Sequence, residues 1–341
     1  MSAKPSVDLY VSYDTIYPAD TVEWCPISEY KDVFVCGTYK LDETNKLKTG
    51  TINLFILEHK NKIKLIQSIH GDAVLDLKWN FCIVSGKILL AAALSGKHIS
   101  VYSLDKEEND LCLNMYTSFN LPKTDDESHM SLSIAWSSPD ENGTQSIAFS
   151  DSRGYITVVN LNDCLVRNFK AHNFESWIVT FHYGEPNILY TGGDDCKFKC
   201  YDQRLKFDKP VFENKEHKQG VTTCSSSKIR KNIIATGSYD EIVRLWDVRN
   251  MKQSYNNVNV NGGVWRLKWE PINEDYILSA SMFNAAHIID TSLNICHSFG
   301  EKNNRLFYGA DWCHLNENKK IISTCSFYDH KLDLFVVNMK L

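Results

Sequence analysis

The stretch ATGSYDEIVRLWDVRN at residues 235–250 places a polar turn between two apolar runs and ends on a Trp-Asp pair. Residues 236–249 align with TGGDDCKFKCYDQR at residues 191–204, with Thr, Gly, two Asp and Arg in matching places. A further copy, CSFYDHKLDLFVV at residues 325–337, keeps the Tyr-Asp pair of the turn and has Phe335 in place of the tryptophan. The stretch is therefore one copy of an internal repeat, and a repeat decides the fold of the whole chain.

Weaker copies of the pattern are found at residues 35–41, 90–103, 148–160 and 279–290. Each copy is preceded by a short segment of alternating apolar residues that usually ends in tryptophan, as in DTVEWCP at residues 20–26. The aromatic residues of this second series are Trp24, Trp79, Trp136, Phe181, Trp269 and Trp312, and its fifth member is the weak copy GVTTCSSS at residues 220–227. Alternation with period two between polar turns predicts strands, so the two series together indicate seven units of four short strands.

Four-stranded sheets repeated around an axis form a β-propeller, which protects its sheet edges. We predict an all-β, seven-bladed WD-repeat propeller that forms a single domain over residues 1–341. The predicted blades are approximately residues 19–71, 73–120, 129–173, 175–218, 220–261, 263–304 and 306–341. The last unit ends after its third strand, so we predict that an N-terminal strand at residues 7–16 completes blade seven and closes the ring.

Composition excludes several classes of function. The formal net charge of -5 and the sequence pI of about 6.1 disfavour nucleic acid as a direct partner, because that needs a clustered cationic surface. No signal peptide and no run of about 18 apolar residues is visible, so we predict a cytoplasmic protein without a membrane segment. The eleven scattered cysteines fit reduced thiols. Cys196 and Cys200 fit ordinary strand positions better than metal ligation, and we predict no metal site.

The propeller rim carries the candidate binding residues, because loops at one end of a propeller usually hold the functional side chains. Two alignments each place residues of several blades at one equivalent position. The turn alignment gives Tyr39, Asp194, Tyr239, Met282 and Tyr328, and the inner-strand alignment gives Asp20, Leu132, Trp177, Trp265 and Tyr308. Aromatic faces with carboxylates suit a cation such as a quaternary ammonium group, although aromatic residues also pack between blades. We predict that substrate is bound by Tyr39, Trp177, Asp194, Tyr239, Trp265 and Tyr328.

The catalytic candidates come from the same turns, since none of the common hydrolase or nucleotide-binding motifs is visible. His330 follows Asp329 at the rim and aligns with Glu241, which follows Asp240. A histidine beside carboxylates is suited to general base catalysis, so these four residues are the predicted catalytic group. Turn aspartates also commonly bond to their own blade. A covalent nucleophile is the alternative, with Ser176, Ser238 and Cys325 as its candidates.

Several peptides are more specific than a general WD repeat. They are DTVEWCP (20–26), CGTY (36–39), AHNFESWI (171–178), GGDDC (192–196), GSYDE (237–241), WDVRNMKQ (246–253), GGVWRLKWEP (262–271), YGADW (308–312) and TCSFYDH (324–330). With these peptides the chain resembles the diphthine methylesterase family from the first blade to the last. The likeness is weakest over residues 42–130, where only the propeller pattern is visible.

The resemblance implies a cytosolic enzyme of diphthamide biosynthesis. Such an enzyme hydrolyses the methyl ester of methylated diphthine on a histidine of elongation factor 2, releases methanol and needs no cofactor. Diphthine carries a trimethylammonium group next to the ester, which suits the predicted aromatic ring. The alternative from another class is a noncatalytic WD-repeat scaffold for protein–protein interaction. The sequence leaves the nucleophile, the general base, the docking of elongation factor 2 and the oligomeric state open.

Overall fold

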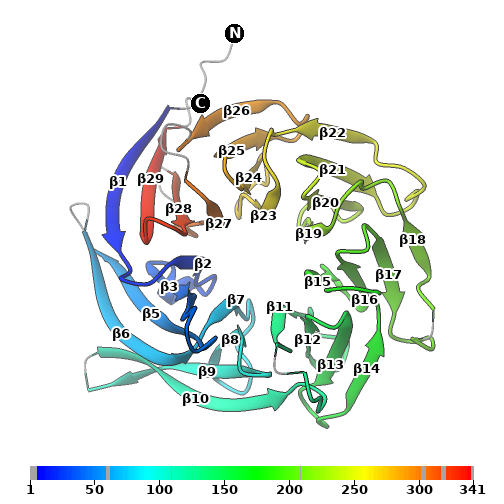
Figure 1. Cartoon of the computed structure of the whole chain (residues 1–341), viewed down its shortest axis with the longest axis horizontal. Helices are drawn as coiled ribbons and strands as arrows, with labels where there is room; N and C mark the ends of the chain where they lie inside the picture. The colour runs from blue at the N-terminus through cyan, green and yellow to red at the C-terminus, as the bar shows by residue number, and fades with distance from the viewer. Residues whose placement is uncertain are drawn as a thin grey trace.

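The computed structural model describes residues 6–58, 62–108, 110–126, 128–207, 209–300, 305–315 and 320–338. Seven antiparallel sheets stand around a central axis, and the strand nearest that axis is the first of its blade in six sheets and β27 in the last (Figure 1). The predicted all-β, seven-bladed WD-repeat propeller is confirmed. Within the described ranges, no helix has the length and apolar character that a membrane span requires.

The strands of the first four blades are as follows. Blade one contains β2 (Ala19–Trp24), β3 (Val33–Thr38), β5 (Lys48–Glu58), β6 (Lys62–Asp72) and the short β4 (Lys40–Leu41), with a 3-10 turn at Ser28–Tyr30. Blade two contains β7 (Val74–Trp79), β8 (Ile88–Leu94), β9 (His98–Glu107) and β10 (Asp110–Asn120). Blade three contains β11 (Ser131–Trp136), β12 (Ser146–Asp151), β13 (Tyr155–Asn160) and β14 (Val166–Lys170). Blade four contains β15 (Ile178–His182), β16 (Glu185–Gly192), β17 (Phe198–Asp202) and β18 (Phe212–Asn214).

The remaining three blades follow the same order. Blade five contains β19 (Val221–Ser226), β20 (Ile233–Ser238), β21 (Ile242–Asp247) and β22 (Asn256–Asn259). Blade six contains β23 (Val264–Trp269), β24 (Tyr276–Ser281), β25 (Ala285–Asp290) and β26 (Ile295–Phe299). Blade seven contains β27 (Phe307–Trp312), β28 (Lys320–Ser326), β29 (Lys331–Asn338) and β1 (Ser6–Asp14).

The ring is closed by β1, as the sequence predicts. This strand pairs antiparallel with β29 from Ser6 opposite Asn338 to Asp14 opposite Lys331. Blades one and seven also meet in the core, where the indole Nε1 of Trp24 donates a hydrogen bond of 2.9 Å to Ser323 Oγ. The first and last segments of the chain therefore share one sheet, and β29 has no free edge.

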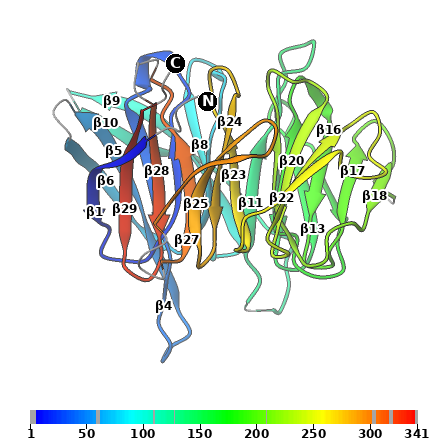
Figure 2. The ribbon, with the colours of Figure 1, turned by 90° about the horizontal axis from the view of Figure 1, so that it is seen from above.

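The hairpin that carries β4 interrupts the regular outline of blade one. It follows Tyr39 directly and projects beyond the neighbouring turns on its side of the molecule (Figure 2). Its base contacts the segment before β11, because Lys48 Nζ lies 3.7 Å from the sulfur of Met130. This side of the propeller, which also holds the segments leading into the inner strands, is called the turn rim below.

Close contact between blades explains a recurrent glycine in the second strand. Gly37, Gly192 and Gly237 face Val74, Val221 and Val264 of the next blade, respectively. A Cβ added to any of the three glycines lies 2.3 to 2.6 Å from a valine Cγ1, which is far inside normal contact distance. The repeated glycine therefore lets the backbone of one blade approach the inner strand of its neighbour.

Gly237→Ala is expected to lower the free energy of unfolding by about 1–3 kcal/mol, because the added methyl group overlaps Val264. Urea denaturation measures the change. Gly71→Ala is the matched control, since a Cβ at Gly71 meets no atom within 4 Å, and its stability should not fall noticeably. Equal losses in the two variants would contradict a steric origin.

A bulge recurs at the start of the inner strands and prepares the site. The pairing between first and second strands skips one residue in β2, β7, β11, β19 and β23, and two residues in β27. The skipped residues are Asp20, Leu75, Leu132, Thr222, Trp265, Tyr308 and Gly309. A bulge residue lies outside the ladder and redirects its side chain. Six blades therefore present an unpaired residue at the same height near the axis.

Candidate functional site

A cavity of about 190 Å³ lies at the end of the channel bordered by the turn rim. Every blade contributes to its wall. The lining residues are Asp20, Tyr39, Leu75, Leu132, Trp177, Thr222, Trp265, Arg266, Tyr308 and Phe327. Six of them are the bulge residues, and Trp177 supplies the same place in blade four, directly before β15. The inner-strand alignment thus identifies one real ring of side chains.

Aromatic side chains form a continuous arc along one side of the cavity. Ring centroids are 5.6 Å apart between Trp177 and Trp265, and 4.9 Å apart between Trp265 and Tyr308. The arc continues from Tyr308 to Phe327 at 5.3 Å and from Phe327 to Tyr39 at 6.3 Å. These separations are typical of interacting aromatic pairs, so the faces support one another around a shared space.

Asp20 is the carboxyl group of this cavity. Its exposed fraction is 8%. Burial raises its pKa to about 8; the charge of Arg266 opposes this rise and that of Asp76 adds to it. A carboxyl with such a pKa exchanges its proton near neutral pH, as a general acid or base must.

Arg266 is held in place from below by Asp76. Its Nη1 lies 3.2 Å from Asp76 Oδ1, and Asp76 is fully buried. The same carboxylate accepts backbone hydrogen bonds from Leu77 and Ile134, each of 3.1 Å, and lies 3.0 Å from Lys78 Nζ. The guanidinium group is therefore fixed at the cavity wall by a carboxylate that is itself fixed by the backbone.

The charged row continues along the channel beyond Asp76. Lys78 pairs with Glu23, which also lies 2.5 Å from Lys268 Nζ. Burial alone raises the pKa of Glu23, but Lys268 and Lys78 outweigh burial and lower that pKa. Lys268 in turn lies 3.5 Å from Asp311. Positive and negative side chains alternate in this row, so their charges compensate one another. Arg266 is the member of the row that lines the cavity.

The structure brings three of the six predicted binding residues into the cavity wall, namely Tyr39, Trp177 and Trp265. Tyr239 lies behind the wall, with its ring 5.8 Å from Trp265 and 6.2 Å from Trp177. Asp194 is exposed, and its Oδ1 accepts a hydrogen bond of 3.0 Å from the indole of Trp177. Tyr239 and Asp194 thus orient the two indoles without lining the cavity.

Tyr328 is not in the cavity, and Phe327 takes its place. The amide of Phe327 donates to Leu306 O at 2.9 Å, as the amide of Tyr239 donates to Gly220 O at 3.0 Å in blade five. After this residue, the turn of blade seven is one residue longer than the turn of blade five. An alignment on the shared Tyr-Asp pair therefore places Tyr328 at the position that Phe327 occupies in the structure. Tyr328 is consequently directed outward.

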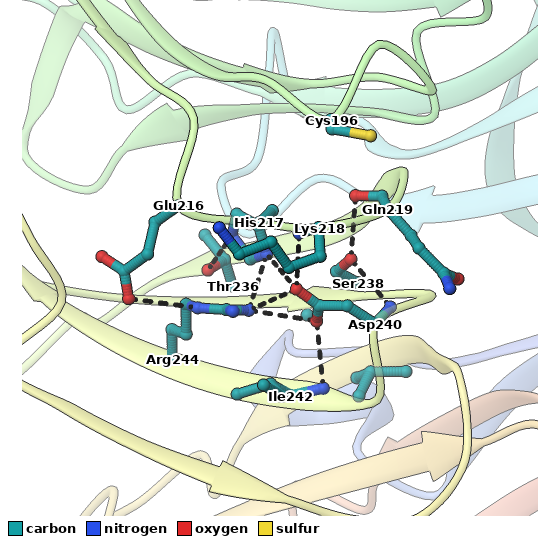
Figure 3. Close-up of polar contacts among 12 residues, drawn as sticks. Cys196, Glu216, His217, Lys218, Gln219, Thr236, Ser238, Asp240, Ile242 and Arg244 are labelled. Atoms are coloured by element: carbon teal, nitrogen blue, oxygen red, sulfur yellow. Dashed lines mark hydrogen bonds and ion pairs between the residues drawn. The ribbon is translucent and has the colours of Figure 1, made fainter.

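Asp240 belongs to the internal network of blade five (Figure 3). Its carboxylate accepts backbone hydrogen bonds from Lys218 at 2.9 Å and Ile242 at 3.1 Å, and Arg244 Nη1 lies 2.9 Å from its Oδ2. His217 lies 3.7 Å away and bonds to the hydroxyl of Thr236 at 3.0 Å. Burial alone would raise the pKa of Asp240, but His217 and Arg244 outweigh burial and lower this pKa. The turn carboxylate therefore ties the blade together and does not line the cavity.

The other three predicted catalytic residues also lie outside the cavity wall. Glu241 is exposed, with φ of 67°. Asp329 accepts a hydrogen bond of 2.7 Å from Arg305 Nε. His330 contributes its carbonyl oxygen to the backbone amide of Thr15 at 2.9 Å, and within the described residues its ring has no hydrogen bond. The structure therefore does not bring the predicted catalytic group together around a shared space.

The alternative nucleophiles are absent from the cavity wall as well. Ser176 is fully buried, and Ser238 Oγ donates to Gln219 O at 3.0 Å. Burial raises the pKa of Cys325 far above its usual value, and Cys36 Sγ lies 3.9 Å from Cys325 Sγ. A buried thiol of this kind is a poor nucleophile.

Sequence reasoning did not include Asp20 and Arg266 among its binding or catalytic candidates, although both line the cavity and the inner-strand alignment already groups Asp20 with Trp177, Trp265 and Tyr308. No sequence pattern pointed to Arg266. It follows the bulge residue Trp265, where the usual alternation of side chains between the two faces of a strand is interrupted. Within the described part of the chain, no three His, Cys, Asp or Glu residues are arranged to hold a metal ion.

Comparison with known proteins agrees with the geometry of the fold. A family model described as "WD domain, G-beta repeat" matches residues 208–247. A chain in a crystal structure of the mitotic checkpoint complex superposes with a TM-score of 0.72 at 14% identity, covering 96% of this chain and 93% of that chain. This likeness concerns the fold alone.

Curated relatives are similar over most of the chain. A diphthine methyltransferase of Mus musculus is 36% identical, covering 92% of this chain and 71% of the relative. The diphthine methyltransferase of Homo sapiens is 33% identical, covering 88% and 73%, and that of Schizosaccharomyces pombe is 30% identical, covering 94% and 95%. With this identity along nearly the whole propeller, the chain belongs to the diphthine methyltransferase family of WD-repeat proteins.

Proposed function

We propose that this chain is an enzyme of diphthamide biosynthesis that hydrolyses the methyl ester of methylated diphthine on elongation factor 2. The products are diphthine and methanol. The observation that carries the proposal is the convergence of an aromatic arc, the Asp20 carboxyl and the Arg266 guanidinium on one cavity. The similarity to proteins named diphthine methyltransferase supports the choice of substrate.

The aromatic arc accounts for recognition of the trimethylammonium group. This cation has no proton to donate, so it binds best against aromatic faces and near a negative charge. The indoles of Trp177 and Trp265 supply such faces, and Asp20 supplies the charge once it is ionised. A bound cation lowers the pKa of a neighbouring carboxyl. Substrate binding therefore favours the ionised form of Asp20 at neutral pH.

The ester then reacts with water activated by Asp20. The carboxylate takes a proton from the water as its oxygen attacks the ester carbonyl carbon, and a tetrahedral oxyanion forms. Arg266 donates hydrogen bonds to this oxyanion, a form of stabilisation that is strong in a buried site. Asp20 returns the proton to the methoxy oxygen as the C–O bond breaks, so methanol and the free acid leave the site.

The direct test uses elongation factor 2 that carries the methyl ester, in water labelled with oxygen-18. Hydrolysis in ordinary water predicts a mass lower by one CH₂ group, and in labelled water attack at the carbonyl carbon also places one oxygen-18 in the new carboxyl group. Label in methanol would instead mean attack on the methyl carbon. A noncatalytic scaffold, the second candidate, predicts binding with no change in mass, and its docking surface would be the exposed apolar turn rim described below.

Trp265→Ala is expected to raise KM by roughly 2- to 30-fold with kcat little changed, because one cation–π contact of about 0.5–2 kcal/mol is lost. Steady-state hydrolysis of the modified factor measures the effect. Trp265→Phe keeps an aromatic face and is the matched control, with a smaller rise. A fall in thermal stability that parallels the loss of activity would instead assign Trp265 to the core.

A further inference from the structure

The turn rim carries the most exposed large apolar side chains of the described residues. The exposed fraction is 75% for Ile16, 69% for Tyr328, 61% for Phe283 and 60% for Phe174, and only Leu9 on the outer strand β1 equals the last. Two further exposed side chains, Leu41 and Leu47, lie on the β4 hairpin. Large apolar groups at these exposures mark a contact surface when they gather on one face. These six residues are called the apolar rim.

Several of these residues are close in sequence to a residue of the cavity wall or to its equivalent in another blade. Phe174 is in the segment leading to Trp177, and Tyr328 follows Phe327. Phe283 follows Met282, whose amide donates to Gly263 O at 2.8 Å, the bond that Tyr239 makes to Gly220 in blade five. The hairpin follows Tyr39, which lines the cavity, and projects beyond the neighbouring turns (Figure 2). The apolar rim thus lies on the same side of the propeller as the cavity mouth, with members from blades one, four, six and seven; Ile16 belongs to the segment between β1 and β2, next to the turn of blade seven.

The backbone at two rim positions favours other residues. Ile16 has φ of 69° and Phe283 has φ of 60°, which is the left-handed region. This region disfavours β-branched and bulky side chains, whereas glycine and asparagine adopt it readily. Local folding therefore does not explain isoleucine and phenylalanine here, and their side chains are not buried in the core either. Strain of this kind is retained where a side chain serves a function.

The volume of the cavity indicates which kind of molecule contacts the apolar rim. A space of about 190 Å³ holds one modified side chain and excludes the protein that carries it. Once the side chain has entered, the surrounding protein surface must lie against the mouth. We propose that the apolar rim is the docking surface for the protein that carries the trimethylammonium side chain, an inference that rests on the proposed function for the identity of that protein. The contacting patch of the partner is apolar.

The test uses the double variant Ile16→Asn and Phe283→Asn. Binding of methyl-esterified elongation factor 2 is measured in an Asp20→Asn background, so that no turnover disturbs the equilibrium. We expect Kd to rise at least roughly tenfold, as for truncation of interface anchors. The thermal unfolding midpoint should stay the same or rise, because asparagine relieves the backbone strain. A purely structural role for the two side chains predicts a lower midpoint.

A small substrate separates docking from chemistry. The methyl ester of trimethylglycine places a trimethylammonium group next to the ester without any protein body. With Asp20 restored, the double variant should hydrolyse this ester at the parental rate, after subtraction of the uncatalysed rate. Parental affinity of the double variant for the modified factor would overturn the docking proposal. Slower hydrolysis of the small ester would overturn it too, since the two residues would then shape the cavity.

The matched control is the double variant Ile83→Asn and Ile229→Asn. These side chains are 55% and 54% exposed and lie in turns at the opposite ends of inner strands β7 and β19. Affinity for the modified factor should remain parental in this control, and a comparable loss would remove the case for the rim. If the rim variant changes from dimer to monomer while its affinity stays parental, the rim is a self-contact and the proposal fails. Tight binding without hydrolysis by the parental chain would refute only the proposed function.

Discussion

Asp20→Asn is expected to lower kcat for hydrolysis of the methylated diphthine ester by at least about 100-fold, the usual contribution of a general base. The amide has the size of the carboxyl group but cannot accept a proton from water. Asp20 is the carboxyl group of the cavity wall, and Arg266 supplies the nearby positive charge. Initial rates with saturating modified elongation factor 2 measure the loss.

The pH dependence of kcat/KM gives a second measurement of the same group. This quantity reports the free enzyme, in which the pKa of Asp20 is about 8. Only the ionised carboxylate acts as base, so kcat/KM should rise with pH below this value and level off above it. The Asn variant should lack the rise.

Stability is the control for this substitution. Burial penalises ionised Asp20, so its folded pKa lies above the unfolded value, and this group lowers stability as pH rises between the two. The Asn variant avoids that penalty and should unfold at no lower temperature than the parental chain near pH 8. Normal turnover in a folded Asn variant would remove Asp20 from the mechanism.

Asp240→Ala is expected to lower the free energy of unfolding by about 3 kcal/mol, because it removes one of the two carboxylates that pair with the buried Arg244 guanidinium and leaves only Glu216, at 3.3 Å. The side chains of Asp240 and Arg244 are both almost fully buried. The Lys218 and Ile242 amides also lose their acceptor. Chemical denaturation at neutral pH measures the change, and turnover per folded molecule should remain close to parental.

The decrease of the free energy of unfolding at acidic pH should also change in the Asp240→Ala variant. The pKa of Asp240 is lowered in the fold, so its contribution is complete above the unfolded pKa and is lost as pH falls through and below that value. The Ala variant should therefore lose less stability on acidification than the parental chain. Asp247→Ala is the matched control, because Asp247 pairs with Arg249 at the surface and should matter little. Intact stability with lost turnover would return Asp240 to the catalytic group.

The ring of cavity residues could be predicted because the inner strands repeat their bulge at the same distance before the tryptophan. An alignment of Trp24, Trp269 and Trp312 therefore also aligns Asp20, Trp265 and Tyr308, whatever their side chains. The turns lack this regularity. One extra residue in blade seven moves Tyr328 outward, and no motif reveals it.

The role of the turn carboxylates depends on side-chain partners that lie elsewhere in the chain. Asp240 is adjacent to Tyr239 in sequence, yet its partners His217 and Arg244 turn it into the blade. Asp20 has no such hydrogen-bonding partner among the described residues, and burial is the largest cause of its raised pKa. Such differences follow from packing, which a linear pattern does not encode.

The bulge at the head of the inner strands has an evolutionary consequence. Because a bulge residue contributes no ladder pairing, a change of its side chain leaves the strand pairing of the blade intact. Exchanging Leu75 or Leu132 for a charged or aromatic residue would alter ligand preference one position at a time. A descendant of this chain could thus acquire a new substrate through a few substitutions, without any insertion or rearrangement of its sheets.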